Sequence, residues 1–352
     1  MNVLLITVRS DFGGGPRHVN QLIGGFPSQI NVFVAFPLEG DPYADQWKKV
    51  VPQDRILGIP YRKFSFVALL KMFFFCKRNH VDIIHSHGNG AGIYSRLLKL
   101  LGVKARIVHT FHGVTDNYSS KLKLFLNKIV GSFLKRFTDV FILVSQGEFD
   151  LAEKMNFIVP SRSVVVFNGV KDPGCTASSE KFKVVTLSRF DYQKNMDMAY
   201  DIALKFKDSD VEFVWVGDGP DFLRLKEKAK KDNLKIEFVG LSDKPIDYLA
   251  ASSLYLSTSR FEGLPYALIE AASLGLPIVA SNVVGNNEVV FNEKNGFLFR
   301  SVDEACGYIQ QFKDNPALLN QMGCASRSLY EKLFSEEMMV KQIVCTYQSH
   351  IK

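Results

Sequence analysis

The sequence has few cysteines and no long uncharged hydrophobic run. Its 352 residues include five cysteines, and no two of them form a Cys-x-x-Cys pair. This spacing argues against a disulfide framework or a zinc ribbon and favours a reducing compartment. No stretch reaches the ~18 uncharged apolar residues of a membrane span; the longest candidate, Phe64 to Cys76, is interrupted by Lys71. The first residues, Met1 to Val8, indicate a buried strand rather than a signal peptide. We therefore expect a cytoplasmic protein.

The composition is that of a soluble globular protein, with 47% hydrophobic and 22% charged residues. The charge is uneven, however. Residues 1–168 hold 21 of the 43 Lys and Arg but only 11 of the 36 Asp and Glu, a net charge of +10, so the remainder carries −3. Such asymmetry indicates a polyanionic partner: anionic lipid, nucleic acid or an acidic glycan. Because no nucleic-acid-binding motif accompanies it, we expect no nucleic acid partner.

Short apolar runs alternate with helical patterns along the whole chain, which predicts an α/β fold with buried parallel strands. The pattern breaks at a polar run, residues 171–180. We expect two doubly wound domains, 1–170 and 181–335, with a last helix at about 336–352 packing back on the first. Predicted strands are Val3–Val8, Val32–Phe36, Val81–His85, Ile107–Thr110 and Val140–Ser145, then Lys183–Ser188, Glu212–Val216, Ile236–Val239, Leu254–Leu256 and Pro277–Ala280.

The most informative stretch is Ser259 to Ala271, which sets Glu262 and Glu270 eight positions apart across a Gly-x-Pro turn. The apolar run Ala267 to Ala272 that follows the turn predicts a helix, with Pro265 near its first turn and Glu270 about two turns inside it. Unpaired N–H groups at a helix N-terminus favour a phosphate. A carboxylate near that phosphate can accept from sugar or ribose hydroxyls.

This stretch resembles the Glu-x7-Glu signature of retaining glycosyltransferases with the GT-B fold, family 4 in particular. The resemblance implies two Rossmann-like domains facing a central cleft, a nucleotide diphosphate sugar as donor, no metal and no further cofactor. It implies that Glu262 holds donor-sugar hydroxyls and Glu270 the ribose, while Gly263, Leu264 and Pro265 approach the nucleotide.

Further motifs follow other predicted strand ends. Gly13, Gly14 and Gly15 let a backbone come close to a ligand, and they resemble the family's N-terminal glycine loop. His112, in Thr110-Phe111-His112-Gly113, resembles the family's histidine near the transferring sugar.

Arg189 and Lys194 resemble the family's Arg…Lys pair that grips the donor diphosphate. Fixed cations suit this position because the leaving diphosphate gains negative charge. The family usually follows the lysine with glycine; Asn195 stands here, and asparagine also tolerates a left-handed backbone. Gly217, in Gly217-Asp218-Gly219-Pro220, resembles a turn that approaches the nucleotide.

No metal site is expected. We expect His85 and His87 to point away from each other and not to share an ion. Asp208 and Asp210 look like the Asp-x-Asp of metal-dependent transferases, but they precede a strand, which indicates a solvated turn.

Two segments combine apolar residues with cations. Tyr118 to Phe137 has five Lys and Arg and no acid, with apolar residues at helical spacing. It predicts either an amphipathic helix on anionic lipid or a helix packed on its own sheet. Val67 to Arg78 is similar, but we expect it to be core.

We therefore expect a metal-independent retaining hexosyltransferase that uses a nucleotide diphosphate sugar, with UDP the expected nucleotide. Its acceptor would be a glycan or a lipid-linked saccharide in surface polysaccharide or lipopolysaccharide synthesis, and the enzyme would be peripheral on the cytoplasmic face of the membrane. Two alternatives stay open: a nucleotide-sugar epimerase of the same architecture, and a non-catalytic nucleotide-sugar-binding subunit.

Overall fold

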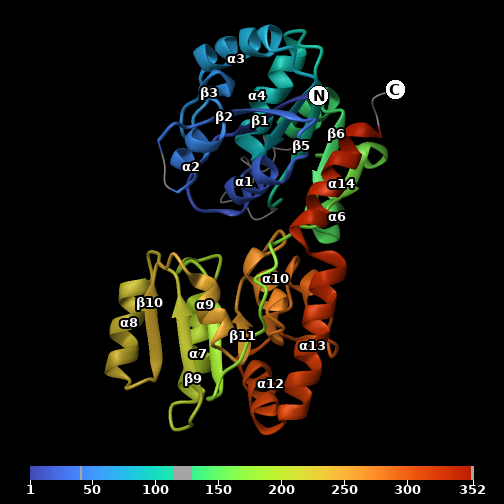
Figure 1. The fold of residues 1–352 in the computed structure, drawn as a ribbon. Helices are drawn as coiled ribbons and strands as arrows, with labels where there is room; N and C mark the ends of the chain where they lie inside the picture. Colours follow the sequence, from blue (N-terminus) through green and yellow to red (C-terminus); the bar gives the residue numbers. More distant parts are fainter. Residues whose placement is uncertain (40–41, 115–128, 350–352) are drawn as a thin grey trace. The chain divides into compact units, whose positions relative to one another are not determined.

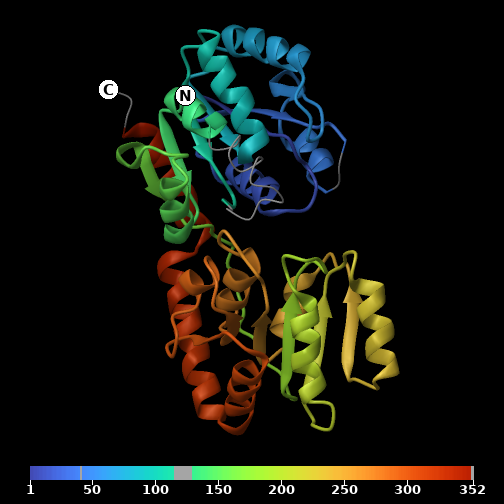
Figure 2. The ribbon, with the colours of Figure 1, turned by 180° about the vertical axis from the view of Figure 1, so that it is seen from behind.

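The computed structural model describes residues 1–39, 42–114 and 129–349. They form two compact units, Met1–Phe167 with Glu337–Lys352, and Asn168–Glu336. Each unit has one parallel sheet with helices on both faces (Figure 1, Figure 2). The polar run 171–180 belongs to the second unit, and the last helix belongs to the first.

The first unit contains a seven-stranded sheet in the order β3-β2-β1-β4-β5-β6-β7. Every pair of neighbouring strands is parallel; Val3 of β1, for example, lies between Val32 of β2 and Ile83 of β4. The strands are β1 (Asn2–Thr7), β2 (Asn31–Phe36), β3 (Ile56–Gly58), β4 (Ile83–His87), β5 (Arg106–Thr110), β6 (Val140–Leu143) and β7 (Ser163–Val165). The helices are α1 (Gly14–Gly25), α2 (Tyr43–Val50), α3 (Phe66–Arg78), α4 (Gly88–Leu100), α6 (Gln146–Lys154) and α14 (Glu336–Gln348), with 3₁₀ turns η1 (Gln53–Arg55), η2 (Lys135–Phe137) and η3 (Pro160–Arg162).

Alternation along β1 builds a core on each face of this sheet. Val3 and Leu5 pack against α1, α2 and α14, while Leu4 and Ile6 pack against α3 and α4. The chain's last helix is therefore part of the first unit's core, and Tyr347 at its end is fully buried.

The second unit contains a six-stranded parallel sheet in the order β10-β9-β8-β11-β12-β13. Its larger core lies between the sheet and α7, α8 and α12. The strands are β8 (Lys183–Leu187), β9 (Glu212–Val216), β10 (Ile236–Gly240), β11 (Leu254–Ser257), β12 (Ile278–Ser281) and β13 (Gly296–Phe299). The helices are α7 (Met196–Lys205), α8 (Phe222–Lys231), α9 (Pro245–Ala250), α10 (Tyr266–Ser273), α11 (Asn286–Val289), α12 (Val302–Asp314) and α13 (Pro316–Leu333).

All ten predicted strands are present, and the prediction of an α/β fold with doubly wound parallel sheets is confirmed. Within the described ranges, no helix combines the length and the hydropathy needed to cross a bilayer. Most of the predicted Tyr118–Phe137 segment lies outside the described residues. At its described end Lys135 donates to the side-chain oxygen of Asn156, and Ile129 and Phe133 are about half exposed.

Candidate active site

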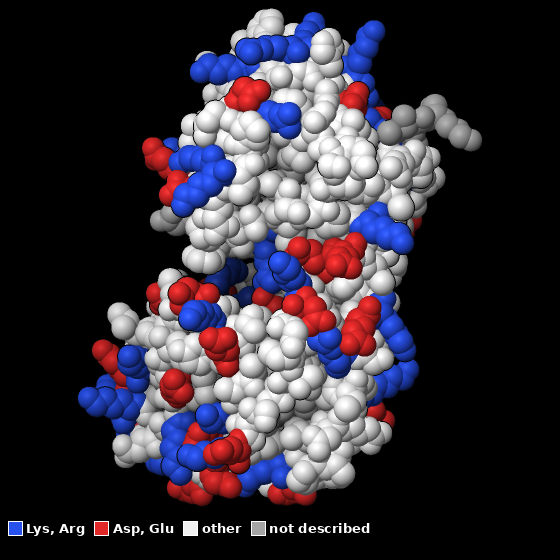
Figure 3. Space-filling model, in the orientation of Figure 1, with Lys and Arg blue, Asp and Glu red and all other residues white. Residues whose placement is uncertain are grey.

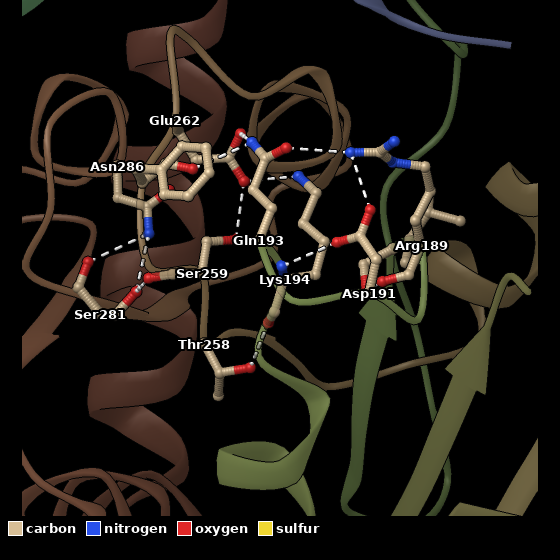
Figure 4. Close-up of polar contacts among 12 residues, drawn as sticks. Arg189, Asp191, Gln193, Lys194, Thr258, Ser259, Glu262, Ser281 and Asn286 are labelled. Atoms are coloured by element: carbon tan, nitrogen blue, oxygen red, sulfur yellow. Dashed lines mark hydrogen bonds and ion pairs between the residues drawn. The ribbon is translucent and has the colours of Figure 1, made fainter. Parts of the chain in front are cut away.

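An ion pair joins two loops at the carboxyl ends of neighbouring strands in the second unit. Lys194 follows β8 and Glu262 follows β11, and parallel pairing brings the ends of these two strands together. The Lys194 Nζ lies 2.5 Å from Glu262 Oε1, and the side chains are only 18% and 7% exposed (Figure 4). The structure thus places a cation and a carboxylate, both predicted site residues, in direct contact.

Neighbouring polar groups fix the Glu262 carboxylate. The Ser259 hydroxyl donates to Oε1 at 2.7 Å. Gln193 Nε2 donates to Oε2 at 3.4 Å and also to the Phe261 carbonyl at 3.0 Å. Burial of a carboxylate costs free energy unless such partners form hydrogen bonds with it. The sequence did not single out Ser259 or Gln193, since a serine and a glutamine in loops carry no pattern of their own.

Arg189 lies on the same loop as Lys194 but is more exposed. Its guanidinium is 3.0 Å from Asp191 Oδ2 and donates to Gln193 Oε1 at 2.9 Å (Figure 4). Its side chain is 56% exposed, three times the fraction for Lys194. Arg189 is therefore oriented by its loop, yet free to reach an anion from the solvent side.

Asn195, which stands where the family usually has glycine, has φ 54° and precedes α7 directly. This is the left-handed conformation, which asparagine tolerates. The Thr258 hydroxyl donates to the carbonyls of both Lys194 and Asn195, at 3.0 and 3.1 Å, so the turn that carries Lys194 is tied to the end of β11.

Gly217 lies where β8 and β9 end side by side. Its φ is 131°, and a Cβ there would lie 1.9 Å from the Ser188 carbonyl oxygen. Any side chain would push this loop away from Ser188, so only glycine fits the close approach. A small pocket opens beside it, and Ser188, Lys194, Ser259 and Glu262 are among its lining residues.

The Gly263–Pro265 turn leads directly into α10, which begins at Tyr266. Pro265 has an extended backbone, with ψ 120°, and stays outside the helix. Glu270 lies about one turn inside α10, since Tyr266 and Glu270 are four positions apart and one turn takes about 3.6 residues. The prediction of two turns is therefore wrong, because it overestimated the depth of Glu270 in the helix. The Glu270 side chain is buried.

The Glu262 turn also rests on the loop after β12. A Cβ on Gly285, whose φ is 87°, would lie 2.4 Å from the Gly263 carbonyl oxygen and 3.0 Å from Glu262 Cβ. Next to it the Asn286 amide donates to the Ser281 carbonyl at 3.0 Å, and the Ser281 hydroxyl donates to the Ser259 carbonyl at 2.6 Å (Figure 4). This chain of contacts extends the support of Glu262 to a third strand end.

In the first unit, His112 and the glycine loop are in contact. A Cβ on Gly15 would lie 3.5 Å from the His112 ring; Gly13 is the N-cap of α1, and Gly14 and Gly15 are its first two residues. His112 has φ 62°, a left-handed conformation that is uncommon outside glycine. Its Nε2 lies 3.1 Å from Nδ1 of His87. The structure therefore brings the predicted glycine loop and the predicted histidine together within this unit.

His112 is part of a histidine cluster, with His18, His85 and His87, between β4, β5 and α1. The expectation that His85 and His87 point apart is wrong: residues two apart on a strand share a face, and their rings are 4.1 Å apart. Loss of hydration, and then the neighbouring cationic forms, lowers the pKa of His85, His87 and His112 well below the usual value. All three rings are therefore neutral at neutral pH.

Glu148 holds the backbone that follows His112. Its carboxylate accepts from Gly113 N at 2.5 Å and Val114 N at 3.0 Å, and its other oxygen accepts from Val144 N at 2.8 Å. The residue is almost fully buried. The sequence did hold a signal, because Ser145 and Glu148 have the spacing of a helix capping box, and the Ser145 hydroxyl does accept from Glu148 N.

Asp208 and Asp210 are exposed and precede β9, so they lie at the opposite end of the sheet from Lys194 and Glu262. Asp210 pairs with Lys313. Across the part of the chain that the structure describes, no group of three or more His, Cys, Asp or Glu side chains is arranged to hold a metal ion.

Comparison with known proteins agrees with this geometry. The family model "Glycosyltransferase Family 4" matches residues 12–172, and "Glycosyl transferases group 1" matches residues 174–329. The fold and the matched residues define a GT-B glycosyltransferase. The chain belongs to the family 4 (group 1) glycosyltransferases, so it is an enzyme that transfers a sugar from a nucleotide-sugar donor.

Several relatives are bacterial glycosyltransferases named for O-antigen or capsular polysaccharide synthesis. The O-antigen biosynthesis glycosyltransferase WbnH of Escherichia coli is 26% identical over 313 residues, 87% of this chain and 88% of that protein. The UDP-Gal:alpha-D-GlcNAc-diphosphoundecaprenol alpha-1,3-galactosyltransferase of Escherichia coli is 29% identical over 258 residues, 67% of each chain. Anabaena HepE in complex with UDP-glucose has the same fold, with a TM-score of 0.86 and 17% identity over 99% of this chain and 100% of that chain.

Proposed function

We propose that this enzyme transfers a hexose from a UDP-sugar to a glycan or lipid-linked saccharide, with retention of the anomeric configuration. The observation that carries the proposal is the Lys194–Glu262 ion pair in a pocket at the strand ends of the second unit. Two similar proteins support the choice of donor and acceptor. One is named for a UDP-galactose donor and a diphosphoundecaprenol-linked acceptor, and HepE was solved with UDP-glucose. Surface polysaccharide synthesis is the corresponding role.

Lys194 and Arg189 would bind the donor diphosphate. The leaving diphosphate gains charge as the glycosidic bond breaks, and an ammonium group held in a site of low exposure stabilises that charge more than it would in water. Lys194 meets this requirement because its loop fixes it and its side chain is 18% exposed. Arg189 can add a second, more mobile cation from the solvent side.

The carboxylates would bind hydroxyl groups. Glu262 would accept from hydroxyls of the transferred hexose, and Glu270 from the ribose. Gly263, Leu264 and Pro265 bring the chain to the first turn of α10, where unpaired N–H groups suit a phosphate. Gly217 lets the loop after β9 approach the nucleotide, since no Cβ stands in the way. In the first unit, His112 would contact the transferred sugar, and Gly13 to Gly15 would approach the donor phosphate.

The proposed reaction balances without a protein nucleophile. The acceptor hydroxyl oxygen forms a bond to the anomeric carbon as the bond from that carbon to the diphosphate oxygen breaks. The hydroxyl proton passes to the departing diphosphate oxygen on the same face of the sugar, so the configuration is retained. Lys194 and Arg189 offset the charge on the departing group, and we infer that no metal ion is needed for this task.

A panel of UDP-sugars tests the proposal. We expect UDP release to depend on both a particular UDP-sugar and a saccharide acceptor. An epimerase would convert the sugar without acceptor, and a non-catalytic subunit would bind UDP without turnover. UDP release that never depends on an acceptor, with lipid-linked and free glycans both offered, would contradict transfer.

A further inference from the structure

Helix α3 of the first unit is apolar on two opposite sides. Ala68, Leu69, Met72 and Cys76 face the sheet and are buried. The expectation that the whole segment is core is wrong, because other apolar side chains of the same helix face solvent. These are Phe66, Val67, Leu70 and Phe74, which are 62%, 62%, 41% and 66% exposed, and Phe64 just before the helix is 49% exposed.

These side chains form one strip. At ~100° per residue, Leu70, Phe74 and Val67 fall at the centre of the exposed arc, and Phe66 lies at its edge. They are large apolar groups gathered on neighbouring turns, and such a patch, unlike single exposed side chains, marks an interaction surface.

Cations lie along one side of the strip and at its C-terminal end. On the same helical wheel, Lys71 and Arg78 fall beyond Val67, while Lys77 falls between Phe66 and Leu70 in the last turn, and all three are exposed. Arg62 and Lys63 add two more exposed cations before the helix. Residues 61–81 contain no Asp or Glu. Figure 3 shows Lys and Arg atoms over the α3 end of the first unit, with uncharged atoms between them.

We propose that this face, defined as Phe64, Phe66, Val67, Leu70 and Phe74 with Arg62, Lys63, Lys71, Lys77 and Arg78, binds anionic lipid bilayers. An apolar strip bordered by cations, on a helix lying along a surface, matches a bilayer whose acyl region is apolar and whose headgroups are negative. A protein partner would need an acidic rim around an apolar groove. A second copy of this chain would bring the same five cations against themselves, which disfavours self-association.

Phe73, Phe74 and Lys77 are in contact at the C-terminal end of this face. The ring of Phe73 lies 5.4 Å from that of Phe74, and the ammonium of Lys77 lies 4.4 Å over the Phe73 ring. The Lys77 ammonium therefore lies against an aromatic face at the C-terminal end of the strip, which is a cation–π contact.

Cosedimentation with vesicles tests the inference, without donor or acceptor, so its failure would leave the proposed transfer reaction standing. We expect the wild type to bind phosphatidylglycerol-containing vesicles at low salt, to bind pure phosphatidylcholine vesicles weakly, and to be released by high salt. Leu70→Ser with Phe74→Ser, and separately Lys71→Gln, Lys77→Gln and Arg78→Gln together, should each lower the partition coefficient by about tenfold or more.

The matched control is Lys226→Gln, Lys230→Gln and Lys231→Gln on α8, which removes the same charge from exposed positions of the second unit. It should bind as wild type does, and circular dichroism should show that every variant is folded. Equal binding by the α3 variants and the wild type, or no binding by the wild type, would overturn the inference. So would α3 variants that only convert a dimer to a monomer, since the face would then belong to a second copy.

Discussion

The Glu148 carboxylate accepts a hydrogen bond from the backbone N–H of Gly113 at 2.5 Å, directly after the left-handed His112. The same carboxylate also binds the N–H groups of Val114 and Val144. A buried acidic side chain thus holds the loop of a proposed site residue from a neighbouring helix.

Glu148→Gln should lower activity at least about tenfold and destabilise the first unit by about 1–3 kcal/mol. Glutamine keeps one acceptor oxygen but turns an NH₂ group toward a backbone N–H, so at least one buried donor loses its partner. The measurements are kcat and the free energy of unfolding. Glu153→Gln, on the exposed side of the same helix, is the control. Wild-type values for Glu148→Gln would show that the loop holds itself.

Lys194→Ala should lower kcat/KM by roughly 10²-fold or more, as loss of fixed transition-state charge stabilisation does. Arg189→Ala should have a smaller effect than Lys194→Ala because the Arg189 side chain is three times as exposed. Calorimetry with UDP should show weaker binding in both. Lys205→Ala, an exposed lysine on α7, should bind UDP normally. If both loop variants turned over like the Lys205→Ala control, the diphosphate would have to bind elsewhere.

Activity should survive EDTA, because Lys194 and Arg189 rather than a metal ion are proposed to offset the leaving charge. The check is the initial transfer rate before and after chelation. Complete loss that Mn²⁺ restores would point instead to carboxylate ligands, and Asp208→Asn with Asp210→Asn would then show whether those two residues supply them.

The first unit should lose stability as the pH falls below about 6.5, the pKa of histidine in an unfolded chain. The folded unit lowers the pKa of His85, His87, His109 and His112, so below that pH the unfolded state binds more protons. Each such residue contributes up to about 1.4 kcal/mol per pH unit until its folded pKa is reached, and above about pH 7.5 the contribution disappears.

The fluorescence of each tryptophan reports on one unit, since Trp47 lies in the first and Trp215 in the second, and both are buried. The second unit, residues 168–336, contains no histidine. Urea unfolding of Trp215→Phe, followed by Trp47 fluorescence, should show the pH dependence. Trp47→Phe, followed by Trp215, should show little of it between about pH 7.5 and 5.5. If the free energy of unfolding fell equally with pH in both units, the histidines would not control the first unit's sensitivity to acid.

The sequence predicted central strands better than edge strands. Most central strands contain an apolar run buried on both faces, which the pattern reveals; β4 is an exception, since it ends in His85, Ser86 and His87. Three strands went unpredicted, β3, β7 and β13, and each is an edge strand of only three or four residues. Such strands owe their pairing to the neighbouring strand rather than to their own hydrophobic pattern.

The candidate site was predictable where a residue belongs to a motif. Glu262, Lys194 and Arg189 follow strands, and parallel strands end at one edge of a sheet, so their proximity could be expected. Ser259 and Gln193 could not be predicted, because their roles depend on contacts between loops. The exposure of Phe74 was also missed: a helix that is apolar all round looks buried, and only the fold shows which side is covered.

The central claim is that the Lys194–Glu262 site supports retaining transfer from a UDP-sugar. The most direct test is a ¹H NMR time course of transfer from an α-linked UDP-hexose, in wild type and in Glu262→Ala. The account predicts that the first linkage formed by the wild type is α and that Glu262→Ala forms product at least about 10²-fold more slowly. A β linkage as the first product, or wild-type rates in Glu262→Ala, would contradict it.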